Sequence, residues 1–138
     1  MDLPKVYVIQ TQVDFVVESA LHYSLGLPQE GVSDNLNLAA VFKDREVGIM
    51  HMGLMAGYIS HRGYPGHNDL LVKIISREPT QRRTTIHIVL REIKQDTLEL
   101  GEIAAVLDLY VTTGHGEPVR VTFGKLNTNP AGSPLISL

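Results

Sequence analysis

The chain has 138 residues, of which 43% are hydrophobic and 20% charged, so we expect a single domain with an apolar core of its own. Its net charge of -3 offers nucleic acid no long-range attraction, and no nucleic-acid partner is predicted. The absence of cysteine excludes a disulfide framework, a thiolate metal site and a cysteine nucleophile, and it predicts a cytoplasmic location. No apolar run approaches the ~18 residues of a membrane span, so no membrane partner is expected.

The first segment with a structural signal is Lys5 to Gln10, a β-branched and aromatic run that predicts a strand. A capping pair and the apolar spacing that follows it predict a helix over residues 11–25. His22 would lie on the surface of this helix. Gln29 to Asn37 is rich in Gly, Ser, Asp and Asn, which is typical of a loop.

The chain is organised around one apolar stretch, Glu46 to Arg62 (EVGIMHMGLMAGYISHR). It is apolar nearly all round, which predicts a helix inside the domain, and Asp44 just before it can serve as its N-cap. Each glycine in such a helix lowers helix propensity by roughly 1 kcal/mol relative to alanine. Because Gly53 and Gly57 lie on one helical face, we expect a smooth strip that a strand or another helix can approach closely.

Four extended segments follow the helix. Leu70 to Ser76 is nearly continuous in apolar residues, as a strand covered on both faces would be. Thr84 to Lys94 and Ile103 to Thr113 alternate between two faces, as half-buried strands do. The Gly-rich turn at residues 114–118 then predicts a hairpin with Val119 to Phe123.

The alternation separates two faces of the predicted sheet. One face carries Ile86, Ile88, Leu90, Ile103, Ala105, Leu107, Leu109 and Val111. The other carries His87, Val89, Arg91, Asp108, Tyr110 and Thr112. These patterns predict an α+β domain over residues 1–126, in which an antiparallel sheet wraps around the central apolar helix, followed by a tail or arm over residues 127–138.

Two segments resemble a known family, the MaoC-like (R)-specific enoyl-thioester hydratases and dehydratases. Ile49 to Ser60, IMHMGLMAGYIS, resembles their central helix, which often reads IAHGMLTAGLIS, and Thr112 to Leu126 looks like their closing hairpin. The resemblance implies a hot-dog fold, in which a sheet wraps the helix and two subunits pair. It also implies an acyl thioester of coenzyme A or of a carrier protein as the ligand, and hydratase, dehydratase or thioesterase activity. We expect no cofactor.

The sequence departs from the family in its catalytic motif. Catalytic members carry D-x-N-P-x-H just before the helix, and its Asp and His position and activate the attacking water. The nearest segment here, Asp34 to Ala39 (DNLNLA), has neither the Pro nor the His. The candidate catalytic residues are therefore His51 and Asp34. For His51 the alternative is a structural histidine that is hydrogen-bonded to Tyr58 or to backbone inside the core.

The resemblance also implies that backbone N–H groups at the start of the helix polarise the thioester carbonyl, which assigns substrate binding to Val47 and Gly48. The alternative for Gly48 is that it makes room for a neighbouring side chain. Arg77, Arg82 and Arg83 surround a predicted turn. They either face solvent there, or contact the phosphates of a coenzyme A or phosphopantetheine arm or an acidic partner.

No metal site is predicted, because His61 and His67 lack the spacing that places two ligands on one helical face. A hypothesis of a different class is a non-enzymatic subunit that self-associates, such as a viral or phage particle component. It is motivated by the incomplete catalytic motif, the few polar residues expected in the core, and the Pro/Gly-rich tail. Both hypotheses predict a homo-oligomer.

Overall fold

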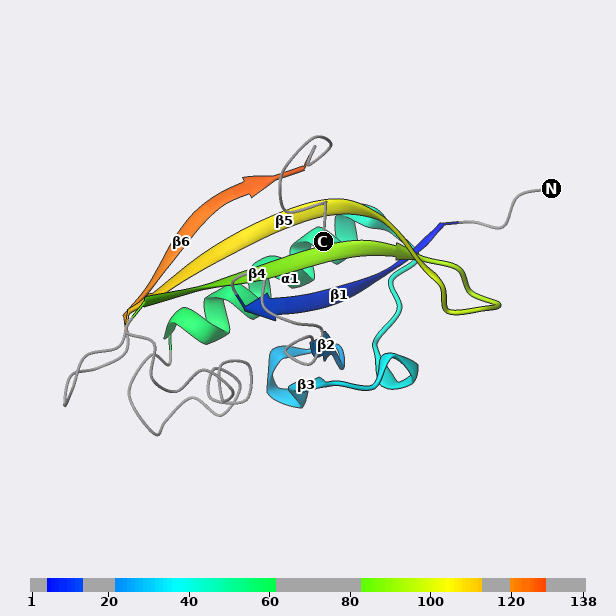
Figure 1. The fold of residues 1–138 in the computed structure, drawn as a ribbon, viewed down its shortest axis with the longest axis horizontal. Coiled ribbons are helices and arrows are strands. Elements are labelled where there is room, and N and C mark those ends of the chain that lie inside the picture. Colours follow the sequence, from blue (N-terminus) through cyan, green and yellow to red (C-terminus); the bar gives the residue numbers. More distant parts are fainter. Residues whose placement is uncertain (1–4, 14–21, 62–82, 113–119, 129–138) are drawn as a thin grey trace.

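The computed structural model describes residues 5–13, 22–61, 83–112 and 120–128, apart from the side chains of Gln29, His61 and Arg83. Within these ranges, six strands form one antiparallel sheet, and an α-helix lies along one of its faces (Figure 1). The predicted α+β class with an antiparallel sheet is therefore confirmed. None of the helices in the described ranges has the length and apolar character needed to cross a membrane.

The sheet is built from strands that are distant in the sequence. They are β1 (Val6–Val13), β2 (His22–Ser24), β3 (Val32–Ser33), β4 (Arg83–Ile93), β5 (Leu100–Thr112) and β6 (Arg120–Asn127). Two short 3-10 helices, η2 (Pro28–Glu30) and η3 (Leu36–Leu38), and the long helix α1 (Arg45–His61) come before β4. The order in the sheet is β3-β2-β1-β4-β5-β6, which puts β6 at one edge of the described sheet.

The long strands after α1 confirm the alternation expected from the sequence. β4 pairs with β5, and β5 pairs with β6, both antiparallel. β5 begins at Leu100, three residues before the predicted start, and β6 extends to Asn127, where the tail was predicted to begin. The predicted strand at Leu70 to Ser76 and the turn at residues 114–118 lie outside the described residues.

The predicted helix over residues 11–25 is wrong at both of its described ends. β1 continues through Val13, paired with β4 along its whole length, and His22 is buried in β2. Thr11, which was expected to cap the helix, is buried within the strand together with Gln12. Pairing with a long neighbouring strand outweighs the local capping signal, because each residue of β1 gains a partner in β4.

The N-cap predicted at Asp44 is confirmed. Its Oδ1 accepts a hydrogen bond from the N–H of Glu46 at 2.8 Å, and its carbonyl accepts one from the N–H of Gly48 at 3.0 Å. One side of α1 is buried against the sheet. The expectation that the helix is enclosed by the domain is wrong for the other side, where Val47 and Met50 are exposed.

The main core fills the space between α1 and the sheet. It joins helix residues such as Met52, Met55 and Ile59 to the predicted apolar face of β4 and β5. A smaller cluster on the opposite face of the sheet contains Val6, Val8, Tyr23 and Ile93. The expectation of few buried polar residues is wrong, because the following are buried: Gln10, Thr11, Gln12, His22, Ser24, Thr84 and His87.

Candidate functional site

His51 lies on the flank of α1 that faces the chain segment just before the helix. The centroids of its ring and the Phe42 ring are 4.8 Å apart, with the two planes inclined at 42°. Phe42 in turn exchanges two 2.8 Å backbone hydrogen bonds with Tyr7 of β1. This flank of α1 therefore faces the β1 side of the sheet.

The His51 ring is held by packing. Its Nδ1 is buried and has no hydrogen-bond partner in the described part of the chain. A buried polar atom without a partner costs about 1 to 3 kcal/mol. The bond to Tyr58 or backbone expected for a structural histidine is thus not made by Nδ1.

His51 belongs to a stripe along α1 that mixes apolar and polar side chains. Val47, His51, Leu54 and Tyr58 follow one another at spacings of four, three and four residues, which places them on one helical flank. We call these four residues the His51 row. Val47 and Leu54 are exposed, at 39% and 48%, whereas His51 and Tyr58 are half-buried. An extended apolar ligand lying along this row would contact Val47 and Leu54, with the His51 imidazole between them.

The start of α1 holds the two residues predicted to polarise a thioester. The N–H of Gly48 already donates to the Asp44 carbonyl, and the side of Gly48 faces β4. A Cβ at residue 48 would lie 2.7 Å from Cδ1 of Leu90, so glycine is needed for close packing. The geometry supports the packing role of Gly48, while Val47 presents its side chain to solvent.

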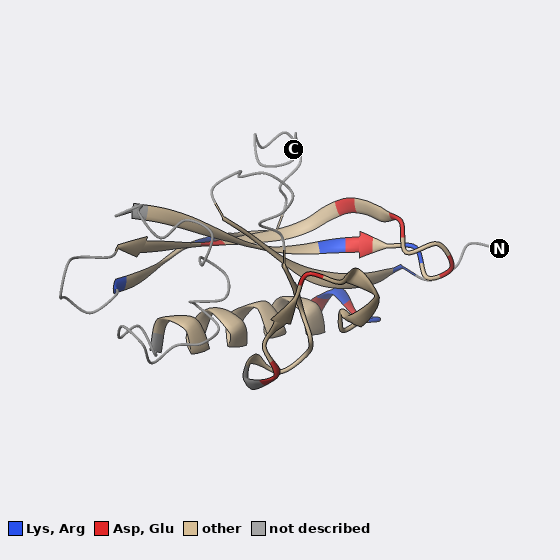
Figure 2. Ribbon diagram, turned by 60° about the horizontal axis from the view of Figure 1, so that its bottom comes forward, with Lys and Arg blue, Asp and Glu red and all other residues tan. Residues whose placement is uncertain are grey.

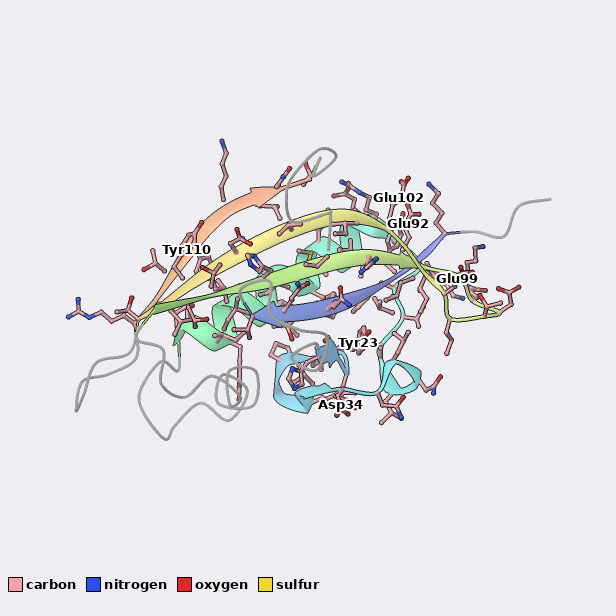
Figure 3. All side chains as sticks on the ribbon, viewed as in Figure 1. Tyr23, Asp34, Glu92, Glu99, Glu102 and Tyr110 are labelled. Carbon is pink, nitrogen blue, oxygen red and sulfur yellow. The ribbon has the colours of Figure 1, made fainter. Side chains whose placement is uncertain are left out.

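The other predicted site residues are not brought to His51 in the described part of the chain. Asp34 is exposed and lies beyond β3, at the edge of the molecule opposite β6 (Figure 3). Arg77 and Arg82 lie outside the described residues, and Arg83 is the first residue of β4, without a described side chain. The predicted residues that do lie close together are in the first turns of α1: Val47, Gly48 and His51.

A polar pair on the other face of the sheet was missed by the sequence reasoning. His87 of β4 and Asp108 of β5 are directly opposite in register, and their Nδ1 and Oδ1 atoms are 2.7 Å apart. The His87 side chain is 5% exposed and that of Asp108 is 23% exposed. The alternation placed both residues on the polar face, but the register that makes them neighbours depends on the β4–β5 pairing. A carboxylate in this position fixes the orientation of the imidazole.

Charged side chains gather at the end of the sheet formed by the β4–β5 turn, where Glu92, Glu99 and Glu102 lie (Figure 3). Lys5 approaches Glu92 at 3.3 Å, and this hydrogen bond to the carboxylate raises the pKa of Lys5. Lys94 approaches Glu99 at 3.4 Å with both side chains exposed. Exposed ion pairs of this kind contribute little to stability. Among the described residues, no group of three or more His, Cys, Asp or Glu side chains is arranged to hold a metal ion.

Comparison of the chain with protein-family models, with curated proteins and with solved structures gave no match.

Proposed function

We propose that this chain is a hot-dog-like protein that binds an acyl thioester along the His51 row. The observation that carries the proposal is an imidazole whose Nδ1 has no hydrogen-bond partner in the described part of the chain, set between exposed Val47 and Leu54. Apolar sites with one or two polar groups are typical of small-molecule binding. The antiparallel sheet lying against one long apolar helix supports the same family of folds.

In this arrangement the acyl chain contacts Val47 and Leu54, and the thioester carbonyl lies beside His51. His51 then acts as a hydrogen-bonding group, and as a general base if water attacks the thioester or the double bond. Asp34 is not beside it, so hydration with the family's paired residues lacks one partner in the described structure. Binding is therefore the first property to test, and hydrolysis or hydration the second.

The binding test is calorimetric titration of the full chain with octanoyl-coenzyme A and with the shorter octanoyl-pantetheine. We expect His51→Ala to weaken binding about tenfold, the effect of one hydrogen bond, and Leu54→Glu to weaken it at least as much. The matched control is Ser60→Ala on another side of α1, where the hydroxyl donates to the Gly57 carbonyl of the same helix. If neither thioester binds, or if His51→Ala binds like the unchanged chain, the proposal fails.

The activity test follows the release of free thiol from octanoyl-coenzyme A and the loss of enoyl absorbance from a 2-enoyl thioester. His51→Ala should abolish whichever reaction is found, with Ser60→Ala unchanged. Binding without either reaction would make the chain an acyl carrier or sensor rather than a thioesterase, hydratase or dehydratase.

The alternative is a subunit that self-associates without catalysis. It is favoured by exposed apolar side chains on the helix side of the molecule, Met50, Phe123 and Leu126. Deleting residues 129–138, the part of the predicted 127–138 arm that follows the described residues, and measuring the assembly mass tests the role of this part. Loss of higher oligomers would support an assembly role for the arm, and an unchanged mass would exclude it.

A further inference from the structure

The sheet holds one aromatic residue, Phe42, against the ring of His51. Phe42 lies two residues before the helix cap Asp44, is 8% exposed, and belongs to the main core. Its backbone N–H and carbonyl exchange two 2.8 Å hydrogen bonds with Tyr7 of β1. Because β1 is paired along its length with β4, the sheet rather than α1 sets the place of the Phe42 ring.

The imidazole of His51 has no carboxylate beside it on its own helix. Charged residues of α1 are confined to its N-terminal end, as the blue and red segments of the helix show (Figure 2). In the other buried imidazole of the sheet, His87, the ring is fixed by the Asp108 carboxylate at 2.7 Å. His51 has the Phe42 ring instead, at 4.8 Å between centroids and 42° between planes, a separation at which tilted rings attract.

The orientation of the His51 ring matters because rotation about its bond to Cβ is soft in histidine. A ring without hydrogen bonds and without a packing partner samples several planes. A donor that is already fixed in one plane binds a ligand better, since the cost of ordering it has been met before binding. The Phe42 contact supplies this order to His51.

The two ring nitrogens of His51 have different surroundings. Nδ1 is buried and has no hydrogen-bond partner in the described part of the chain, whereas Nε2 is not among the buried atoms that lack a partner. A ligand on the half-buried ring therefore meets Nε2. A carbonyl oxygen only accepts, so Nε2 has to carry the ring hydrogen. The buried Nδ1 is then an acceptor without a partner, which proteins tolerate more often than an orphaned N–H.

We propose that Phe42 is a positioning residue of the acyl site: its ring holds the His51 imidazole so that Nε2–H points out of the domain as the donor to the thioester carbonyl. This role rests on the proposed function. Of the two roles given to His51 above, the hydrogen-bond donor is the one that this tautomer permits at Nε2. The same N–H would stabilise negative charge that develops on the carbonyl oxygen during attack at the thioester.

The first test is nuclear magnetic resonance of the full chain with ¹⁵N in its histidine rings. We expect the His51 ring protons to be displaced by the ring current of Phe42, and the ring hydrogen to be on Nε2. Phe42→Leu should remove the displacement and leave the His87 signals in place. The matched control is Tyr23→Leu, an aromatic residue that is also 8% exposed but packs on the opposite face of the sheet; it should leave His51 unchanged.

Two results of this experiment would overturn the proposal. One is a ring hydrogen on Nδ1 of His51, which the unchanged chain alone can reveal. The other is a set of His51 signals that does not respond to Phe42→Leu in a folded chain. Circular dichroism establishes that each variant is folded.

The second test is calorimetric titration with octanoyl-coenzyme A. Phe42→Leu should weaken binding about threefold, because the imidazole remains but must be ordered on binding, and Tyr23→Leu should leave it unchanged. In a chain that already carries His51→Ala, Phe42→Leu should have no further effect, since a positioning residue acts through the group that it positions. Equal losses in both backgrounds would show that Phe42 acts through the fold and would overturn the proposal.

Failure of the positioning role and failure of the proposed function give different results. If the unchanged chain does not bind octanoyl-coenzyme A, the proposed function fails, and the donor role fails with it. If the unchanged chain binds and Phe42→Leu binds equally well, acyl binding stands and the positioning role of Phe42 is wrong.

Discussion

Gly48 of α1 packs so closely on Leu90 of β4 that an alanine Cβ at residue 48 would lie 2.7 Å from the Leu90 Cδ1 atom. Leu90 is fully buried, so its side chain would have to shift within the core to admit the added methyl group. We therefore predict that Gly48→Ala lowers the free energy of unfolding by about 1 to 3 kcal/mol through overpacking, despite the better helix propensity of alanine. Urea denaturation of the two chains measures the difference.

The control for this substitution is Gly53→Ala on the open side of the same helix. Among the described residues, no atom lies within 4 Å of its added Cβ, so only helix propensity changes, and the free energy of unfolding should rise by up to about 1 kcal/mol. If Gly48→Ala and Gly53→Ala lower the free energy of unfolding equally, contact with Leu90 is not the reason for glycine at residue 48.

Asp44 should contribute more to stability than its exposed position suggests. Its carboxylate caps α1 at the N–H of Glu46, and loss of such a cap costs about 0.5 to 2 kcal/mol. Asp44→Ala should therefore lower the denaturation midpoint, whereas Asp34→Ala, another exposed aspartate, should change it little. If the two variants unfold at the same urea concentration, the capping bond is not formed in solution.

Arg45 should hold the end of β6 to the start of α1. Arg45→Lys retains the charge but loses the planar group that reaches the carbonyls of Ala104 and Thr128. We predict faster amide hydrogen exchange along β6, with the exchange of β1 unchanged. Exchange that accelerates equally in both strands would indicate global destabilisation instead of a local tether.

The part-buried pair of His87 and Asp108 should be a stabilising contact between β4 and β5. Asp108→Asn removes the charge from a 2.7 Å hydrogen bond. It should lower the free energy of unfolding by about 1 to 3 kcal/mol. The control is Asp96→Asn in the exposed β4–β5 turn. Its free energy of unfolding should differ from that of the unchanged chain by no more than about 0.5 kcal/mol. If Asp108→Asn and Asp96→Asn lower the free energy of unfolding by similar amounts, the contact with His87 contributes nothing beyond the loss of one carboxylate charge.

The sequence predicted those parts of the fold in which local chemistry and tertiary packing agree. The cap at Asp44, the extent of α1 and the alternation of β4 and β5 all follow from residues close together in the chain. The helix predicted over residues 11–25 fails at its described ends because its capping pattern competes with a long-range pairing. The strand predicted over Lys5 to Gln10 ended too early, because polar Gln12 gave no sign that it is buried in a strand.

The candidate site was predictable in part. The sequence identified His51, Val47 and Gly48 on one helix, and it anticipated that Gly48 has a packing alternative, which the contact with Leu90 supports. It did not identify the His87 and Asp108 pair, because strand register is decided by contacts between distant segments. The exposure of one side of α1 was also not predicted. An apolar helix face has the same sequence pattern whether it is covered by its own chain or by a partner.

The most direct measurement of the central claim is photo-crosslinking of the full chain with an acyl-coenzyme A that carries a diazirine on its acyl chain, followed by peptide mapping. Binding along the His51 row predicts labels on α1 between Val47 and Tyr58 that octanoyl-coenzyme A competes away and that Leu54→Glu reduces. Labels that resist competition, or that fall on the opposite face of the sheet around Tyr110, would contradict acyl-thioester binding at this helix.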